Sequence, residues 1–157
     1  MQLVSGRKGA VGHRCSVAEL EADVNLSPTG VDAIYDAARL IAFIADLGDE
    51  LANGHYDDGF DIWHSILSIG MVEGGTAFNV VAGACEFTLD LKNAPQVDRH
   101  AISARIIDFA TTTLLPGMVD VYPRANIRFE RMLARPGCEL PADDPLIGQL
   151  GGDDWLQ

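Results

Sequence analysis

Basic residues are scarce in this sequence, and their scarcity excludes several classes of partner. Of the 157 residues, 11 are Lys or Arg and 23 are Asp or Glu, so the formal net charge is −12. Nucleic-acid binding requires clusters of Lys and Arg that neutralise phosphates, and anionic membrane surfaces attract the same side chains. We therefore expect neither a nucleic acid nor a membrane surface as a partner.

Long apolar runs and paired cysteines are also missing. No stretch of about 18 apolar residues occurs, so we expect no transmembrane helix. The first residues, MQLVSGRKG, lack the apolar segment of a signal peptide. The cysteines Cys15, Cys85 and Cys138 are odd in number, far apart and not arranged as CxxC. This pattern is typical of reduced thiols in a cytoplasmic protein, and not of disulfides or a zinc knot.

The hydrophobic residues are spaced as in strands and helices of a globular α+β domain. Hydrophobic residues make up 48% of the chain and charged residues 22%, enough for one domain with a core. In chain order the spacing predicts a strand at 8–22, a helix at 30–51, strands at 60–72 and 79–91, a helix at 96–115 and a strand at 119–132. This order predicts a ferredoxin-like split βαβ sandwich, with a four-stranded antiparallel sheet and two helices on one face.

Several details of these elements can be predicted. Ser27 and Pro28 are expected to begin the first helix as its N-cap and first residue, and Pro116-Gly117 is expected to end the second. In the strand at 79–91, the residues expected to face the core are Cys85, Phe87, Leu89 and Leu91. In the first helix, one broad buried face is expected from Val31, Ile34, Ala38, Ile41 and Ala45, widened by Leu40, Phe43, Ile44 and Leu47.

Catalytic and metal-binding patterns are not found. The four histidines show no metal-ligand spacing, and His13 and His64 are interpreted as partly buried strand residues. Residues 55–58 are interpreted as a solvated acidic loop in preference to a cation site. There is no nucleophile elbow, Walker loop or dinucleotide fingerprint, and Cys15 and Cys85 are expected to be small buried hydrophobes. From the residues alone we assign no catalytic residue and no metal ligand.

Three sequence strings resemble a known pattern in the right order. They are SGRKG at 5–9, EADVNLSPTGVDAI at 21–34, and GGTAFNVVA at 74–82 followed by CEF at 85–87 and DLK at 90–92. Together they resemble the dimerisation (lid) domain of the zinc-dependent acetylornithine deacetylase, succinyl-diaminopimelate desuccinylase and glutamate carboxypeptidase family, in particular its acetylornithine deacetylase branch. The resemblance implies a lid domain at 1–133 and, at 134–157, a segment that leads back toward an absent catalytic domain.

The resemblance also implies a function for the complete enzyme. Such an enzyme would hydrolyse an N-acyl amino acid, with a role in arginine biosynthesis, at zinc (or cobalt) ions held by a separate catalytic domain. The lid would clamp the substrate and stabilise the oxyanion. No residue here matches the family's metal ligands, so we expect this chain to be a fragment that holds no cofactor of its own and is inactive when isolated.

The lid residues expected to bind substrate are Gly75, Asn79 and Lys92. Asn79 matches the family's substrate-contacting asparagine, whose amide both donates and accepts hydrogen bonds, although an asparagine after a Gly-Gly turn also caps strands. Lys92 stands where many members carry arginine, so it supplies charge without a bidentate fork. The alternative interpretation of Lys92 is a solvated lysine at a strand end.

Asp23 departs from the family pattern. By resemblance this position carries a histidine that reaches across the dimer and donates to the developing oxyanion, which an ionised carboxylate cannot do. Either the local alignment differs, or the acyl-transfer function is lost or altered. We expect Asp23 at the end of the first strand, exposed near the tip of the sheet.

The expected partner is a second copy of the chain, bound through an edge strand and the neighbouring helix. Residues 60–70 contain no proline and one charged residue, Asp61, so this edge lacks the usual protection against pairing. The last strand has residues that discourage pairing, namely Pro123, Arg124, Arg128, Glu130 and Arg131. The alternatives are a monomer whose edge is covered by the tail from Ala134, and a stand-alone small-molecule binding or oligomerisation module that has lost catalysis.

Overall fold

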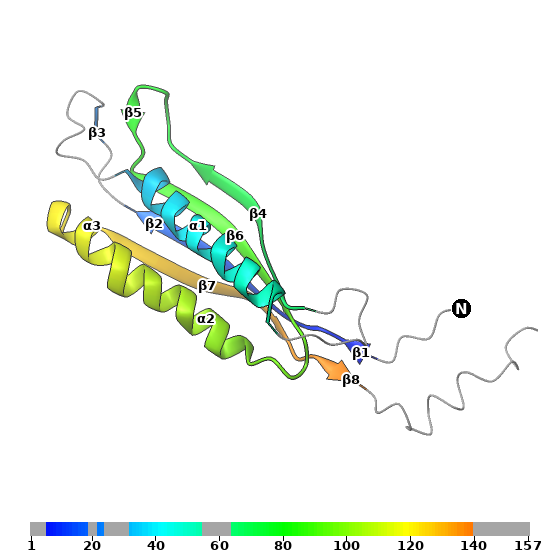
Figure 1. Ribbon diagram of the computed structural model, residues 1–157. Coiled ribbons are helices and arrows are strands. Elements are labelled where there is room, and N and C mark those ends of the chain that lie inside the picture. Colours follow the sequence, from blue (N-terminus) through cyan, green and yellow to red (C-terminus); the bar gives the residue numbers. More distant parts are fainter. Residues whose placement is uncertain (1–5, 19–21, 24–31, 55–63, 140–157) are drawn as a thin grey trace, which may run out of the picture.

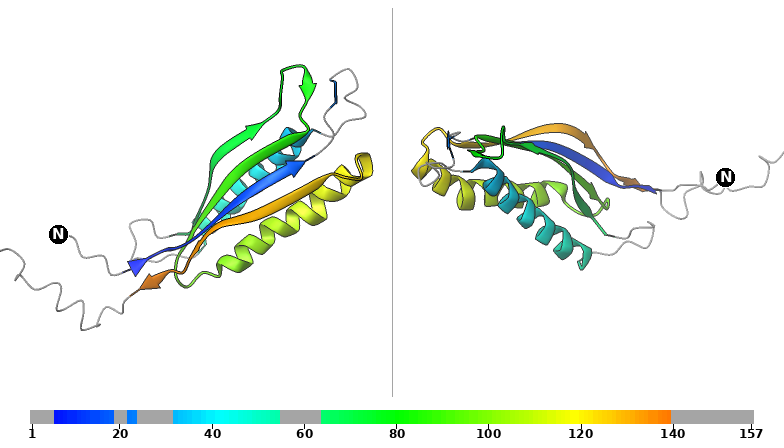
Figure 2. Two further views of the ribbon diagram at one scale, coloured as in Figure 1. Left: turned by 180° about the vertical axis from the view of Figure 1, so that it is seen from behind. Right: turned by 90° about the horizontal axis from the view of Figure 1, so that it is seen from above.

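The computed structural model describes residues 6–18, 22–23, 32–54 and 64–139, without the side chains of Ala22, Asp23 and Glu139. Its centre is a four-stranded antiparallel sheet in the order β4-β6-β2-β7. The strands are β2 (Gly9–Ala18), β4 (Ile66–Gly74), β6 (Ala84–Asn93) and β7 (Asn126–Arg135). The helices α1 (Ala33–Ala52) and α2 (Arg99–Asp108) cover one face of the sheet (Figures 1 and 2), which confirms the predicted fold class.

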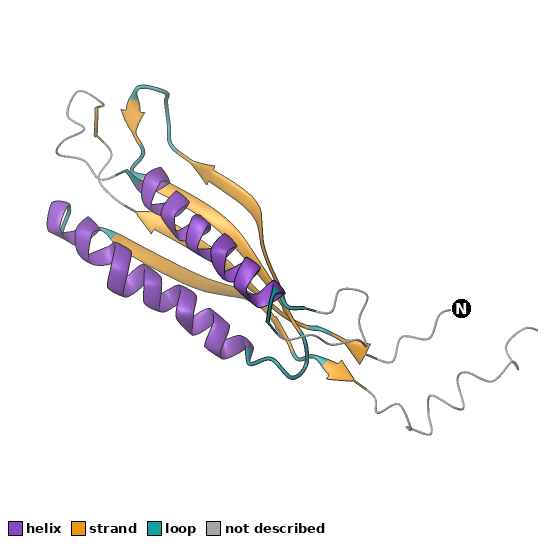
Figure 3. Cartoon of the chain, in the orientation of Figure 1, coloured by secondary structure: helices purple, strands orange, loops and turns teal. Residues whose placement is uncertain are grey.

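Two short ladders mark the two ends of the sheet. At one end, β1 (Gly6–Arg7) pairs with β8 (Cys138–Glu139), where the described chain enters and leaves the sheet. At the other end, β3 (Ala22–Asp23) pairs with β5 (Val80–Val81). Figure 3 shows these two small pairs at opposite ends of the main sheet. We call the β1–β8 end the base and the β3–β5 end the tip.

The core lies between the sheet and the two helices. The predicted inward residues of β6, namely Cys85, Phe87, Leu89 and Leu91, are all buried. In β2, which pairs with β6 along its whole length, Val11, Cys15 and Val17 are buried on the same face. The alternation of apolar and polar residues in β6 therefore predicts its faces correctly, because one face packs on helices and the other meets water.

The first helix differs from the prediction at its start and in its buried face. Its N-cap is Asp32, whose Oδ1 accepts hydrogen bonds from the N–H groups of Ile34 (2.9 Å) and Tyr35 (3.4 Å). The predicted Ser27 and Pro28 lie outside the described residues. The buried apolar face is made by Ala33, Ala37, Leu40, Ile44 and Leu47. Part of the predicted core stripe is exposed, since Ile34 is 39% exposed and Ala38 and Ala45 also face solvent.

The second helix continues past the predicted stop at Pro116-Gly117. Residues Phe109–Leu114 form a π-helical stretch, η2, and α3 follows at Leu115–Val121. At the junction the N–H of Leu115 donates to the carbonyl of Ala110, five residues back. Pro116 thus falls in the first turn of a new α-helical register, where a missing N–H costs little. For the same reason the predicted last strand is wrong at its start: Val119 and Val121 are helical, and β7 begins at Asn126.

The remaining boundaries shift by a few residues. β4 begins at Ile66, after His64, instead of at the predicted position 60, and residues 55–63 and 140–157 lie outside the described residues. The expected first strand from 8 to 22 corresponds to β2, and Asp23 belongs to the separate β3. Among the described residues, no helix is long and apolar enough to cross a membrane.

Candidate functional site

A glycine corner after β4 shapes the tip of the sheet. Gly75 has φ of 77°, a left-handed conformation that favours glycine. A Cβ atom at Gly75 would lie 3.3 Å from Cδ1 of Ile34, and one at Gly74 would lie 3.0 Å from both the carbonyl oxygen of Ala84 and Sγ of Cys85. The N–H of Gly75 donates to the carbonyl of Ala84 at 3.2 Å. Both glycines are therefore required where the chain turns away from β6.

The loop after this corner carries the predicted substrate residue Asn79. Residues 76–79 are all exposed, and the N–H of Val80 closes the loop by donating to the carbonyl of Ala77 at 3.2 Å. Asn79 stands directly before β5, at the tip. Its exposed amide is free of any strand-capping contact with the described residues, which leaves both its donor and its acceptor directed to solvent.

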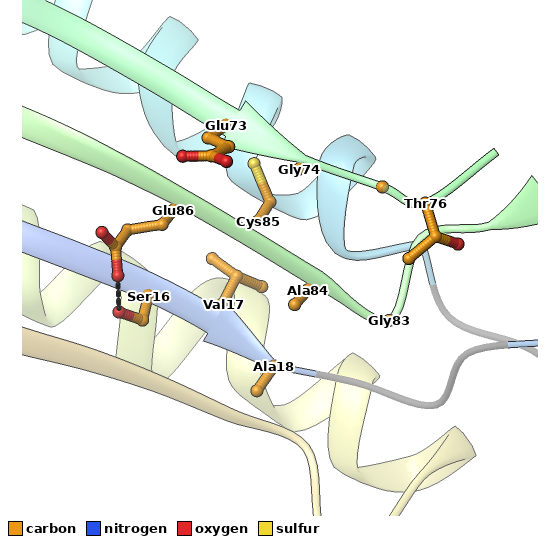
Figure 4. Close-up of a pocket in the computed structure, with 11 residues that line it drawn as sticks. Ser16, Val17, Ala18, Glu73, Gly74, Thr76, Gly83, Ala84, Cys85 and Glu86 are labelled. Atoms are coloured by element: carbon orange, nitrogen blue, oxygen red, sulfur yellow. Dashed lines mark hydrogen bonds between the residues drawn. The ribbon is translucent and has the colours of Figure 1, made fainter. Parts of the chain in front are cut away.

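Two hollows flank the glycine corner, and Gly75 lines both of them. One, of about 410 Å³, opens on the sheet face that carries no helix and is lined by Ser16, Glu73, Thr76 and Glu86, among others (Figure 4). The second, of about 370 Å³, lies beside the start of α1 and is lined by Ile34, Tyr35, Ala77 and Val80, among others. Asn79 and Lys92 line neither hollow.

Carboxylates dominate the first hollow. Glu73 and Glu86 are directly opposite in the β4–β6 register, an arrangement that is unfavourable for like charges. Arg14 compensates part of this charge: its Nε lies 3.2 Å from Oε1 of Glu86, and its Nη1 lies 3.2 Å from Oε2 of Glu130. The Ser16 hydroxyl donates to the other oxygen of Glu86 at 3.1 Å (Figure 4). Glu86 is thus tied to β2, whereas Glu73 faces the hollow without a described cation.

Asp23 lies beside the loop that contains Asn79. In the β3–β5 ladder Asp23 is opposite Val80, the residue that follows Asn79. The second and third resembling strings therefore meet at the tip. Asp23 is not the end of the first strand, since β2 ends at Ala18, but its backbone does lie at the tip of the sheet (Figure 1). Its side chain lies outside the described part of the chain.

Lys92 lies far from the tip within one chain. It is opposite Ile66 in the β4–β6 register, whereas Gly74 is opposite Cys85. Seven residues of β6 separate the two positions, which corresponds to about 23 Å along an extended strand. At the base, the ammonium of Lys92 forms an ion pair with Asp90 at 3.0 Å. One copy of the chain brings Gly75 and Asn79 together but leaves Lys92 apart.

The described residues do not form a metal site, and the two buried thiols, Cys15 and Cys85, are not reactive. No group of three or more His, Cys, Asp or Glu side chains within 6–18, 22–23, 32–54 and 64–139 is placed to hold a metal ion. Burial, with smaller contributions from Cys85 and Glu86, raises the pKa of Cys15 to about 12. Burial and then the carboxylate of Asp32 raise the pKa of Cys85. Both thiols stay protonated near neutral pH, in agreement with the prediction of buried hydrophobes.

The predicted strand histidines are in ordinary surroundings. His13 is half-buried in β2 with its ring edge-on to Phe129, at 6.5 Å between ring centres. Burial and the nearby Arg131 lower the pKa of His13. Nδ1 of His64 lies 2.8 Å from the carbonyl oxygen of Ser65, just before β4. Neither ring converges with other potential ligands among the described side chains.

A second candidate surface follows the open edge of β4. The α1 residues Ile34, Ala38, Ile41, Ala45 and Gly48 recur at helical spacing and contain no charge; we call them the α1 stripe. The stripe borders β4, because a Cβ at Gly48 would lie 3.7 Å from Cβ of Leu67. On β4 itself, Met71 and Val72 are 66% and 59% exposed. The sequence analysis predicted most of this stripe to be buried in the core. The feature of the sequence that could have revealed an exposed stripe is the width of the apolar face, which is too wide to pack against one partner.

Comparisons with known proteins identify the family of this domain. A family model described as a peptidase dimerisation domain matches residues 5–118. Acetylornithine deacetylase from Aliivibrio fischeri (strain MJ11) is 23% identical over 146 residues, which cover 92% of this chain and 37% of the relative. Acetylornithine deacetylase from Myxococcus xanthus is 30% identical over 67 residues, covering 43% of this chain and 18% of the relative. The chain thus spans well under half the length of these relatives.

Solved structures share the fold at low sequence identity. An aminopeptidase from Bacillus cereus superposes with a TM-score of 0.68 at 20% identity, over 92% of this chain and 34% of that one. A hydantoinase/carbamoylase family amidase from Burkholderia ambifaria gives a TM-score of 0.68 at 16% identity, over 88% and 31%. The resemblance found in the sequence motifs is confirmed: because the family model matches most of its length, the chain belongs to the peptidase dimerisation domain family.

Proposed function

We propose that residues 1–133 are the dimerisation and substrate-clamping lid of an acetylornithine deacetylase-like hydrolase that acts on N-acyl amino acids. Residues 134–157 then lead back toward the catalytic domain, and the cytoplasmic location and the role in arginine biosynthesis remain predictions. The observation that carries the proposal is the open β4 edge beside the uncharged α1 stripe, in a chain that matches such deacetylases over 92% of its length.

The proposed partner is a second copy that pairs with β4. An edge strand offers unpaired N–H and C=O groups, and β4 contains no proline and one charged residue, Glu73. Two-fold symmetry requires the two β4 strands to run antiparallel and the two α1 stripes to face each other beside them. Apolar burial and main-chain hydrogen bonds must outweigh the repulsion between two chains of net charge −12.

This pairing brings the proposed substrate residues together across the dimer. If β4 pairs with itself along its full length, Gly74 of one copy is opposite Ile66 of the second. Ile66 is in turn opposite Lys92 in the β4–β6 register. Lys92 of the second copy then lies two strands from the glycine corner, about 10 Å away at the usual strand spacing. Gly75 and Asn79 from one copy and Lys92 from the other thus flank one site.

These residues have suitable chemistry for an N-acyl amino acid. The amide of Asn79 can donate to a carbonyl or carboxylate and accept from an N–H, and the Lys92 ammonium attracts a carboxylate. The glycine corner admits a ligand close to the backbone. Zinc or cobalt does not fit the described residues, since they offer no converging ligand set, so we place the metal outside them and assign this chain binding and orientation only.

Calorimetry with N-acetyl-L-ornithine tests the shared site. Asn79→Ala and Lys92→Ala should each weaken binding severalfold, and an equal mixture of the two variants, after subunit exchange, should recover part of the binding capacity. Recovery occurs because one of the two sites in a mixed dimer keeps both residues. The matched control is Lys8→Ala, a basic residue also near the base. Equal loss in both variants without recovery on mixing contradicts a site shared between copies.

A second candidate is a binding or oligomerisation module without catalysis. It is favoured by Asp23, which lies at the tip where the resembling family carries a histidine. If a longer protein that contains this chain binds N-acetyl-L-ornithine but does not hydrolyse it with zinc or cobalt present, and Asp23→His gains hydrolysis, this candidate replaces the first. If no N-acetyl amino acid gives binding heat, only oligomerisation remains.

A further inference from the structure

The tip carries an aromatic side chain that nothing in the described chain covers. Phe78 is fully exposed, at 102% of the reference value, and Tyr35 at the start of α1 is 67% exposed. Ile34, 39% exposed, and Tyr35 line the second hollow together with Ala77 and Val80, the residues on either side of Phe78 and Asn79. Single exposed apolar residues are common on protein surfaces, but here Ile34 and Tyr35 line one hollow and Phe78 follows Ala77, a further residue of its lining.

The loop that presents Phe78 is held in shape by its own backbone. Gly75 turns the chain with a positive φ, its N–H is bound to Ala84, and the N–H of Val80 closes the loop onto Ala77. β5 then pairs with β3 on the far side. Phe78 is therefore presented outward by a closed loop, which lowers the entropy cost of burying it against a partner.

We propose that Phe78 is an anchor that packs against the base of a second copy of this chain. The inference rests on the proposed pairing of β4 with itself. Any antiparallel pairing of most of β4 with its copy directs the tip of each chain past the start of the other chain's β4, because Gly74 leads into the loop and Ile66 begins the strand. Phe78, four residues beyond Gly74, is then beside the partner's base and not beside its tip.

The base offers a suitable surface for an aromatic ring. Leu51 near the end of α1 and Leu67 at the start of β4 are only half-buried in one copy, and both lie on the face of the sheet that the helices cover. These residues lie at the end of the α1 stripe, so the contact with Phe78 continues the proposed dimer surface outward. A buried aromatic side chain removes roughly 150–250 Å² from water, a useful share of the roughly 1,200–2,000 Å² that a stable interface buries. Two such contacts occur in each symmetric dimer.

Sedimentation of the 157-residue chain with Phe78→Ser tests the anchor. We expect the variant to keep its circular dichroism spectrum, because Phe78 contacts no core residue, and to raise the dimer dissociation constant at least about tenfold. Phe78→Leu should recover most of the affinity, since it keeps an apolar side chain. The control is Met132→Ser on β7, which removes another exposed apolar side chain (54% exposed) from the opposite edge and should leave the dissociation constant within about twofold.

The outcomes separate the two proposals. A dimer whose dissociation constant is unchanged by Phe78→Ser overturns the anchor and leaves the β4 dimer standing. Equal weakening by Phe78→Ser and Met132→Ser also overturns it, because the effect would not be specific to the tip. A wild-type chain that stays monomeric overturns both the dimer and the anchor.

Discussion

The two edges of the main sheet are built differently. β4 carries one charged residue, Glu73, and borders the uncharged α1 stripe, whereas β7 carries Arg128, Glu130, Arg131 and Arg135. Pro123 precedes β7. Both edge strands have one irregularity in register, β7 opposite Gly12 and His13 and β4 between Ile69 and Met71, so this feature does not distinguish them. Charged side chains are a usual means by which a protein protects an edge strand from association. The difference indicates that one edge is closed to partners and the other is kept open.

The same asymmetry extends to the helices. On its α2 side, α1 contributes Phe43, whose ring stacks on Phe109 at 4.1 Å, and Glu50, which forms a two-pronged ion pair with Arg105 at 2.7 Å. On its β4 side, the α1 stripe is only partly covered: Ile41 packs against the core, whereas Ile34, Ala38 and Ala45 are exposed. A helix that makes packing and ion-pair contacts on one side but leaves apolar residues exposed on the other is expected where a second molecule packs.

Proline substitutions should reveal the difference between the two edges most strongly. Because successive N–H groups of a strand point alternately to either side, one of Leu67→Pro and Ser68→Pro removes an N–H that faces the open edge. That variant should keep the fold and lose the dimer, as measured by circular dichroism and sedimentation. The matched pair Arg128→Pro and Phe129→Pro on β7 should leave the dimer intact in whichever variant folds. A folded β4 variant that still dimerises contradicts pairing through β4.

A charge placed in the α1 stripe should have the next largest effect. Ala45→Glu puts two carboxylates in the proposed interface and should weaken the dimer at least about tenfold, because desolvation and like-charge repulsion both oppose association. Ala45 is exposed, so the monomer should melt at nearly the same temperature. Ala104→Glu, an equivalent change at an exposed position of α2, is the control. Equal weakening by the two changes would argue against a role for the stripe.

Removing the charges of β7 should make the two edges more alike. The triple variant Arg128→Val, Glu130→Val and Arg131→Val leaves an edge of β-branched residues with little protection. We expect species larger than a dimer in size-exclusion chromatography, because two open edges allow continued growth. The ion pair between Arg14 and Glu130 is lost as well, with only a small cost at an exposed position. A clean dimer at high concentration would show that charge is not what protects β7.

Salt should have a moderate effect on association. Each chain carries a net charge of −12, so two copies repel each other, and added sodium chloride screens this repulsion. We expect the dimer to tighten severalfold between low and physiological ionic strength. Weakening with salt would instead indicate an interface held by ion pairs, in conflict with the uncharged α1 stripe.

The smallest effect on stability and association is expected from a substitution on the side of α1 that contacts α2. The hydrogen bonds from Arg105 lower the pKa of Glu50, so this carboxylate contributes stability above its unfolded pKa of about 4.5 and loses it as the pH falls through the lower folded value. Glu50→Gln should therefore reduce the melting temperature slightly at pH 7 and not at all in strong acid. The dimer dissociation constant should be unchanged. A weaker dimer would place this flank in the interface.

The sequence predicted the parts of the fold that depend on simple alternation. The buried face of β6 followed from the alternation of residues such as Cys85, Phe87 and Leu91, because this central strand packs on helices along its length. The order of elements also followed from the spacing of hydrophobic residues. The second helix was ended too early because Pro116 is acceptable in a new helical register that no local pattern signals. The N-cap at Asp32 was missed because an alternative cap, Ser27, stood nearby.

The candidate site was only partly accessible from sequence. The predicted strand at 79–91 already put Asn79 and Lys92 at opposite ends. It began too early, however, because Asn79 lies in the loop that follows Gly75 and β6 begins at Ala84. Periodicity could not distinguish the buried face of α1 from the exposed α1 stripe, since both are apolar. The hollows beside Gly75 depend on Ile34 and Tyr35, which come from a distant segment.

Sedimentation equilibrium of the unmodified 157-residue chain at micromolar concentration tests the central claim most directly. An open β4 edge beside an apolar helix flank predicts a reversible dimer with twice the chain mass of 16.9 kDa. A single species of 16.9 kDa across the concentration range would contradict the account. The open edge and the α1 stripe would then both be exposed to solvent, with no second copy bound to them.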